Sequence, residues 1–123
     1  MSERPRELKD RLYELHAELC RAMASEKRLE ILDTLKRGER CVDDLADIIG
    51  TTKANTSQHL GVLRATGIVC GRREGRSVYY SICDPRIAEA CGLIRDVMLD
   101  RLRRRESSLR EIVDYAESHL PEE

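Results

Sequence analysis

The chain has 123 residues, which fits a single domain and leaves no room for a catalytic domain with a separate cofactor domain. Its 22 basic and 23 acidic residues, with a pI near 6.3, argue against a protein that coats nucleic acid indiscriminately. The absence of Trp and Phe leaves a small core of Leu, Ile, Val, Ala and four Tyr, which favours close helix packing over a β-sandwich.

The first two predicted elements are helices. The first runs from about residue 7 to residue 23 and carries one narrow apolar stripe, which favours packing against another helix. The stripe consists of Leu8, Leu12, Leu15, Leu19 and Ala22. The second begins after Ser25, a good N-cap, and stops at Gly38 behind a cationic pair. We expect it to bury Leu29, Leu32 and Leu35.

Two further helices follow and are joined by the tripeptide Gly50-Thr51-Thr52. The third ends at Gly50, and its residues Val42, Leu45, Ile48 and Ile49 are expected to face inward. Thr52 is the predicted cap of the fourth, which Gly67 closes. Along the fourth helix Thr56, Leu60 and Leu63 recur at i, i+4 and i+7, so they share the inward face. Helix lengths and turn chemistry are those of a helix-turn-helix.

The next segment predicts a two-stranded β-hairpin, or wing, that bends at Glu74 and Gly75. Val78, Tyr80 and Ile82 alternate toward the body of the domain, and Tyr79 faces outward. Asp84 and Pro85 then start a helix that continues to about residue 119. A charged stretch at residues 102–105 interrupts its apolar stripe, so we expect a bend or break there.

The fold class is therefore mainly α with a two-stranded wing, as one domain over residues 1–123. Its terminal helices, about 7–23 and 85–119, offer apolar area that a partner can cover, so we expect a homodimer formed through them.

Positive charge is concentrated on the fourth helix and the wing. Five basic residues and one acidic residue lie between residues 51 and 81, whereas the tail from residue 106 is strongly acidic. A polar helix followed by an arginine-tipped hairpin predicts contact with base edges and with flanking phosphates. The predicted DNA contacts are Thr52, Lys53, Asn55, Ser57, Gln58, His59, Arg72, Arg73 and Arg76.

Side-chain chemistry assigns these residues different roles. Asn55 and Gln58 match the bidentate hydrogen bonding of adenine, and Lys53 near the helix N-terminus matches a phosphate. Ser57 and His59 fit bases or phosphates, and the wing arginines fit the backbone or minor groove. Each of these side chains is, as the alternative, an ordinary solvated polar group.

Several strings resemble the ArsR/SmtB winged-helix repressors: SEKRLEIL, GERCVDDLA, ANTSQHLGVLRATGIV and REGRSVYYSI, followed by a helix that starts with Asp-Pro. The resemblance covers nearly the whole chain. It is closest to members fused to a rhodanese sulfurtransferase domain, and the chain ends at Glu123 without one. It implies a homodimeric repressor of double-stranded DNA with an inverted-repeat operator, released when a small effector binds.

The effector is less clearly predicted. The family's arsenic-sensing members carry CVCDL, whereas this chain has CVDDL, with Cys41 retained and Asp43 in place of the second thiol. The family's zinc sensors need imidazole ligands on the terminal helix, and no His lies between Asp84 and Arg105. The preferred hypothesis is therefore reactive sulfur species or an oxidant acting on thiols. A metal or metalloid effector with a cysteine-containing site is the alternative, its ligands unknown, and no cofactor is required.

The candidate effector thiols are Cys41, Cys91 and Cys20. Cys41 occupies the N-cap position of the third helix, where the helix dipole stabilises a thiolate, although the two aspartates that follow oppose this. Cys91 lies on an apolar stripe, which favours a buried interface thiol. Cys20 follows His16 by one helical turn, a two-ligand fragment for a soft metal. Cys70 and Cys83 flank the wing, and no functional role is predicted for either.

The remaining sequence features bear on cellular location and on rival functions. The chain lacks a C-x-x-C pair, a secretory signal and any apolar run near the roughly 20 residues of a membrane span. We expect reduced thiols, a cytoplasmic location and no membrane partner. An enzyme is disfavoured because the sequence contains no phosphate loop, no G-x-S-x-G elbow and no paired-carboxylate motif. A module that binds only protein, with an incidental basic hairpin, is the remaining rival.

Overall fold

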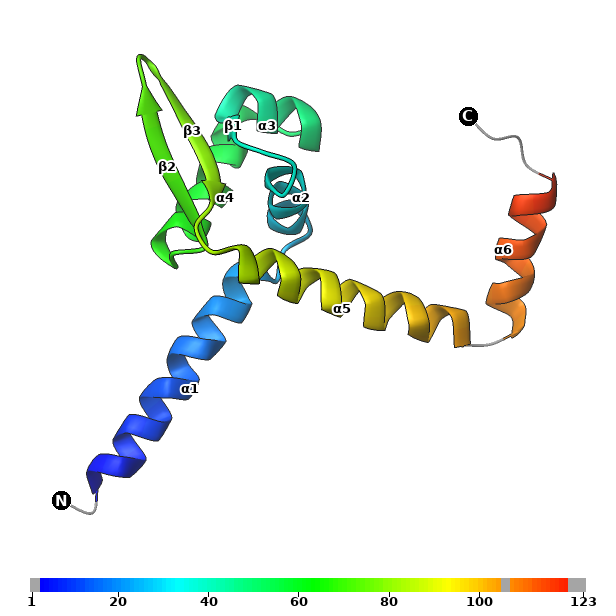
Figure 1. Cartoon of the computed structure of the whole chain (residues 1–123), viewed down its shortest axis with the longest axis horizontal. Coiled ribbons are helices and arrows are strands. Elements are labelled where there is room, and N and C mark those ends of the chain that lie inside the picture. The colour runs from blue at the N-terminus through cyan, green and yellow to red at the C-terminus, as the bar shows by residue number, and fades with distance from the viewer. Residues whose placement is uncertain (1–2, 105–106, 120–123) are drawn as a thin grey trace. The chain divides into compact units, whose positions relative to one another are not determined.

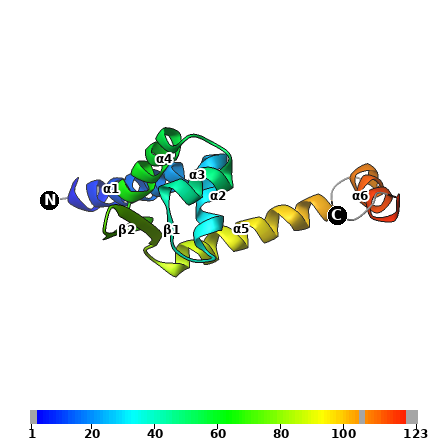
Figure 2. The same cartoon turned by 90° about the horizontal axis from the view of Figure 1, so that it is seen from above.

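The computed structural model describes residues 3–104 and 107–119. The chain forms two compact units, residues 1–88 and 89–123. In chain order the elements are α1 (Glu3–Met23), α2 (Glu26–Leu35), β1 (Arg40–Cys41), α3 (Val42–Ile49), α4 (Lys53–Ala65), β2 (Val69–Glu74), β3 (Ser77–Ile82), α5 (Pro85–Arg104) and α6 (Ser107–His119). Figures 1 and 2 show them in two views.

The core of the first unit lies where α2, α3 and α4 meet the base of the wing. Its side chains are aliphatic apart from one hydroxyl, as the composition required: Ala22, Ile31, Leu32, Leu35, Leu45, Ala46, Ile49, Leu60, Leu63, Ile68, Val69 and the buried Thr56. Thr56 is tolerated because its hydroxyl donates to the carbonyl of Thr52 at 2.8 Å. The predicted inward face of α4 is thereby confirmed.

Two predicted inward residues face solvent instead. Leu29 of α2 and Ile48 of α3 are 44% and 55% exposed. The nearby positions Ile31 and Ile49 are buried. A helix packed on one side cannot bury its whole apolar arc, and the positions of its neighbours decide which edge stays open.

Helix ends follow the local signals closely. Ser25 caps α2 by accepting the N–H of Arg28, and Gly50 and Gly67 take positive φ values of 68° and 76° where α3 and α4 end. Lys27 of α2 then donates to the carbonyl of Ile49 at 2.7 Å, which fixes the C-terminal end of α3 against α2. The helix-turn-helix is therefore set both by its turn and by this link.

The wing contains one strand more than the sequence predicted. Within the described residues the sheet has the order β1-β3-β2, and the short β1 pairs antiparallel with β3 through Arg40 opposite Tyr80. The hairpin itself turns at Gly75, which has a φ of 64°. The predicted alternation is blurred, because all residues from Val78 to Ile82, including Tyr79, are half-buried.

The terminal helices differ from their predicted bounds. α1 begins at Glu3 rather than near residue 7, and Figure 1 shows its N-terminal part extending away from α2–α4. Two helices, α5 and α6, lie within the predicted segment 85–119. α5 continues through Leu102, Arg103 and Arg104, where a bend or break was expected, and residue 105 lies outside the described residues. Among the described residues no helix is long and apolar enough to cross a membrane.

Candidate nucleic-acid interface

The turn before α4 presents the first residues of that helix to solvent. Thr52 is extended and its hydroxyl accepts the backbone N–H of Asn55 at 3.1 Å, so Thr52 is confirmed as the N-cap. Asn55 also donates through its side-chain amide to the hydroxyl of Thr51 at 3.3 Å. Capping therefore orients Asn55 in the first turn of α4.

Most of the α4 residues that were predicted to contact DNA are exposed on one side of the helix. Lys53, Asn55, Ser57 and Gln58 face solvent while Thr56, Leu60 and Leu63 face the core. Lys53 lies 3.3 Å from a carboxylate oxygen of Asp43 on α3. The side chains of this pair are 70% and 66% exposed, so salt screens the pair and a phosphate competes with it readily. Base or phosphate contact by these four residues stays a prediction.

His59 lies apart from that exposed group. It is half-buried, and its Nδ1 lies 3.4 Å from a guanidinium nitrogen of Arg28 on α2. The same guanidinium donates to the carbonyls of Ala22 at 2.5 Å and Arg21 at 3.3 Å, in the last turn of α1. The structure places His59 in a link between α1, α2 and α4, and its predicted contact with DNA stays a prediction. Arg28 was not singled out from the sequence.

The wing arginines fall into two groups. Arg73 and Arg76 are exposed beside the turn at Gly75, as predicted for a hairpin tip. Arg72 is also exposed, but it is engaged by side chains of the protein itself. It donates to Glu39 at 3.0 and 3.3 Å and to Glu74 at 2.8 Å, and it lies over the ring of Tyr79. Side-chain hydrogen bonds raise the pKa of Arg72, with the larger effect from Glu39 and the smaller from Glu74. In turn, the hydrogen bond from Arg72 lowers the pKa of Glu39.

Arg64, at the end of α4, adds a cation that belongs to the basic stretch but was not predicted to contact DNA. Its guanidinium lies close to Gly71 of β2. If Gly71 were replaced by a residue with a Cβ atom, that Cβ would lie 3.4 Å from Nη1 of Arg64. A glycine at this point of β2 therefore lets the α4 arginine lie against the wing. The positive charge of Arg64 therefore lies beside the hairpin.

Cys41 faces a hollow of about 260 Å³ between the start of α3 and the wing. Its lining also contains Arg76, Asp43 and Tyr80. Cys41 occupies the N-cap position as predicted, and its side chain makes no capping hydrogen bond. A candidate effector thiol and a predicted DNA-contacting arginine thus share one hollow.

The other cysteines depart from the predictions. The expectation of reduced thiols is wrong for Cys70 and Cys83, which form a disulfide, whereas Cys20, Cys41 and Cys91 are not disulfide-bonded. The bonded residues lie 13 apart in sequence, and only the hairpin pairing brings them together, so spacing alone carried no signal. Cys20 is exposed and Cys91 is half-buried. Across residues 3–104 and 107–119, no group of three or more His, Cys, Asp or Glu side chains could hold a metal ion.

A capped, solvent-facing polar helix in a helix-turn-helix, followed by a hairpin with exposed arginines, defines a winged-helix DNA-binding protein. The model of the family described as bacterial regulatory proteins, arsR family, matches residues 25–70. The HTH-type regulator Rv0081 of Mycobacterium tuberculosis is 41% identical over 88 residues, which cover 71% of this chain and 77% of that protein. The chain belongs to the ArsR family and is a DNA-binding transcriptional regulator.

Solved structures agree with the fold. The crystal structure of Rv0081 superposes with a TM-score of 0.72 at 40% identity, covering 76% of this chain and 95% of that one. The homodimeric winged helix-turn-helix DNA-binding domain Mb0332 of Mycobacterium bovis gives a TM-score of 0.73 at 34% identity, covering 80% of this chain and 91% of that one. The M. tuberculosis transcriptional repressor SmtB is 39% identical over 84 residues, covering 68% of this chain and 59% of that protein.

Proposed function

We propose that this chain is a cytoplasmic homodimeric repressor that binds an inverted-repeat operator and is released when an effector modifies its thiols. The observation that carries DNA reading is the exposed face formed by Lys53, Asn55, Ser57 and Gln58, together with the exposed tip arginines Arg73 and Arg76. Polar side chains in the first turns of the helix suit base edges, and arginines on a narrow ribbon suit phosphates.

Two apolar stripes support a dimer. On α1, Leu8, Leu12 and Leu15 are 58%, 64% and 47% exposed, although they repeat at helical spacing. The middle of α5 carries a similar exposed set: Leu93, Ile94, Val97 and Met98. Contiguous apolar surface of this kind is typical of an interface, and the relative Mb0332 is homodimeric. A pair of protomers would present two α4 helices to successive major grooves.

Thiol chemistry is the proposed signal because Cys41 opens onto the hollow that contains Arg76. An adduct on the Cys41 sulfur would occupy space beside that guanidinium and compete with its contact to DNA. Persulfides and oxidants are the reagents that modify a thiol without requiring a preformed set of metal ligands.

DNA binding is tested with a duplex that the purified protein selects from a randomised pool. The Arg73→Ala/Arg76→Ala variant should bind more weakly across all sequences, and its log–log salt slope should fall by about one per lost phosphate contact. Arg6→Ala, on exposed α1, removes the same kind of charge and serves as the control. An unchanged slope in the wing variant, or equal loss in both variants, would show that the hairpin does not grip DNA.

The effector is tested on the same duplex. Titration with a glutathione persulfide, hydrogen peroxide, Zn²⁺ or arsenite, with fluorescence anisotropy as the readout, separates thiol modification from metal binding. We expect release by the first two reagents and reversal by dithiothreitol. Release by Zn²⁺ or arsenite alone would favour the metal-responsive alternative instead.

A further inference from the structure

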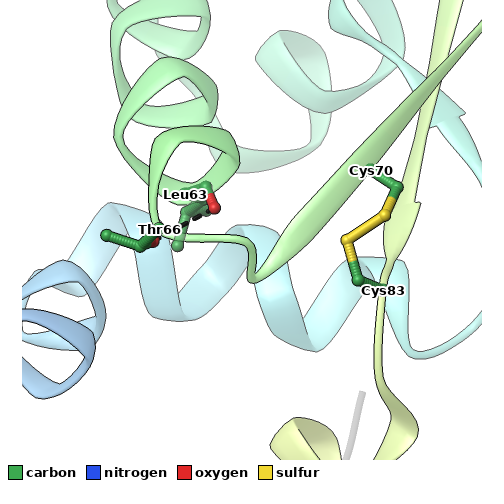
Figure 3. Close-up of a disulfide and its surroundings, with 4 residues drawn as sticks. All are labelled: Leu63, Thr66, Cys70 and Cys83. Carbon is green, nitrogen blue, oxygen red and sulfur yellow. Dashed lines mark hydrogen bonds between the residues drawn. A yellow bond between two sulfur atoms is a disulfide. The ribbon is translucent and has the colours of Figure 1, made fainter. Parts of the chain in front are cut away.

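Cys70 and Cys83 lie on one face of the wing at its base. Cys70 is in β2 opposite Ser81, and Cys83 is two residues beyond Ser81, so the alternation of strand residues places both cysteines on the same face. Their Cα atoms are 5.3 Å apart, and Figure 3 shows the sulfur bridge between the strands. Both residues are exposed. Small oxidants and reductants therefore have access to this bond.

The backbone holds the two cysteines together without help from the sulfur bond. Beside them, Val69 pairs with Ile82, and the N–H of Cys83 donates to the carbonyl of Ile68 at 3.0 Å. Ile68 and Val69 are buried in the core. Breaking the disulfide removes none of these contacts, so the reduced thiols stay within the Cα separation that a disulfide needs, roughly 4.4–6.8 Å. The site is built for reversible oxidation.

The bond joins the two ends of the wing at the point where the wing leaves α4. The N–H of Ile68 donates to the carbonyl of Leu63 at 2.9 Å, and the hydroxyl of Thr66 donates to the same carbonyl at 3.1 Å (Figure 3). Cys83 directly precedes Asp84, which leads into α5. The closed bond adds a covalent link to this hydrogen-bonded pairing, so the base of the wing can twist less in the disulfide form than in the dithiol form.

Arg72 gives that restriction a consequence for DNA binding. It shares a face with Cys70, pairs with Tyr79 across the hairpin, and is bound by Glu39 outside the wing. To meet a phosphate, Arg72 must leave Glu39, which precedes β1. A twist of the β2–β3 hairpin about its base displaces Arg72 of β2 relative to Glu39. A closed disulfide opposes that rotation and keeps the guanidinium on its carboxylate partners. The disulfide form is then the weaker DNA binder.

We propose that Cys70 and Cys83 are a redox-active dithiol whose oxidation to the disulfide weakens operator binding by restraining the wing. The inference rests on the proposed function and names which thiols act in it. With hydrogen peroxide as oxidant, one thiolate attacks a peroxide oxygen, an S–O bond forms, the O–O bond breaks and one water leaves. The second thiol attacks that sulfur, the S–S bond forms, the S–O bond breaks and a second water leaves. Two thiols lose two electrons, and peroxide becomes two waters.

The test uses four forms of the full chain, which are the wild type, the Cys83→Ala variant and two variants with several Ser substitutions. The Cys20→Ser/Cys41→Ser/Cys91→Ser variant keeps only the wing pair, and the Cys70→Ser/Cys83→Ser variant keeps only the other thiols. Each is reduced with dithiothreitol and then treated with hydrogen peroxide. Intact mass under non-reducing conditions reports the loss of two hydrogens, and anisotropy reports affinity for the selected duplex.

We expect peroxide to lower the affinity of the wild-type chain and of the variant that keeps the wing pair by about fivefold or more, with full recovery in dithiothreitol. The variant without the pair keeps Cys41, so peroxide should lower its affinity clearly less than it lowers the affinity of the wild-type chain. If it loses affinity as the wild-type chain does, or if the wing pair forms no disulfide, the inference is overturned while thiol-controlled DNA binding stands.

Absence of DNA binding in every reduced form would instead remove the proposed function. A Cys83→Ala variant is included because Cys83 lies outside the strands, so it tests the same bond with less disturbance of the ladder. If peroxide lowers the affinity of the Cys83→Ala variant as much as that of the wild-type chain, the inference is also overturned.

Discussion

Replacement of Arg28 by Ala would remove the side chain that joins α2 to the end of α1 and to α4. Its guanidinium donates to the carbonyls of Ala22 at 2.5 Å and Arg21 at 3.3 Å and lies 3.4 Å from Nδ1 of His59. These carbonyls belong to the last turn of α1, where helix acceptors have no partner within the helix and the macrodipole favours a cation.

The expected loss can be worked from these contacts. A hydrogen bond to a charged group contributes about 1.5–3 kcal/mol when it is well formed, but two of the three contacts are long and the side chain is half-exposed. We therefore expect Arg28→Ala to lower the free energy of unfolding by about 2 kcal/mol. Arg28→Lys keeps the positive charge but loses the planar guanidinium with its several N–H donors. We therefore expect it to lower the free energy of unfolding by about half as much as Arg28→Ala does.

Urea unfolding followed by far-UV circular dichroism measures the effect. With an m value of roughly 2 kcal/mol/M, the midpoint of Arg28→Ala should fall by about 1 M. All variants are compared at one protomer concentration, because dimerisation makes apparent stability depend on it. Arg37→Ala, exposed just beyond the end of α2, is the control and should change stability by less than about 0.5 kcal/mol.

DNA binding should change as well. Because Arg28 contacts His59 of α4, Arg28→Ala should weaken binding to the selected duplex under conditions in which the protein remains folded. Equal midpoints for the Arg28→Ala and Arg37→Ala variants would refute the idea that this guanidinium holds the three helices together. Unchanged DNA affinity in a destabilised Arg28→Ala variant would confine its role to stability.

Three further outcomes are expected. Gly50→Ala should destabilise by about 1–2 kcal/mol because φ is 68°, whereas Gly61→Ala, within α4 and with open space at its Cβ, should stabilise by about 0.5–1 kcal/mol; thermal melting compares them. Leu12→Asp should shift the dimer toward monomer in light scattering, and an unchanged mass would remove α1 from the interface. The side-chain hydrogen bond from Arg86 lowers the pKa of Asp84 from 3.8 to about 2, so its contribution to stability is present above 3.8 and is lost as pH falls toward 2. An Asp84→Asn variant should lack that acid dependence, and parallel acid curves for both proteins would contradict it.

Local signals predicted much of the helix-turn-helix because each acts over only a few residues. A hydroxyl at Ser25 or Thr52 finds the N–H three residues ahead of it, and a glycine at position 50 adopts a left-handed conformation with little help from the rest of the fold. Helical spacing likewise identified Thr56, Leu60 and Leu63 as the buried face of α4. Exposure of the opposite face follows from the same periodicity.

The contacts that position α4 and the wing join residues that are distant in sequence. Arg28 and His59 are 31 positions apart, and Arg72 and Glu39 are 33 apart, so no short pattern pairs them. The same holds for Cys70 and Cys83, because only the register of β2 against β3 brings their Cα atoms to 5.3 Å. Which edge of a helix stays open, as at Leu29 and Ile48, is set in the same way by neighbouring elements.

The sequence by itself thus determined the helices and caps up to the wing, the basic hairpin and the exposed polar face of α4, since these follow from dihedral preferences and periodicity. Only the tertiary structure decided that Arg72 is held by Glu39, that His59 lies in a link to α1, and that the wing base is closed by a disulfide. Those features arise when the core packs and brings distant backbone segments to fixed separations.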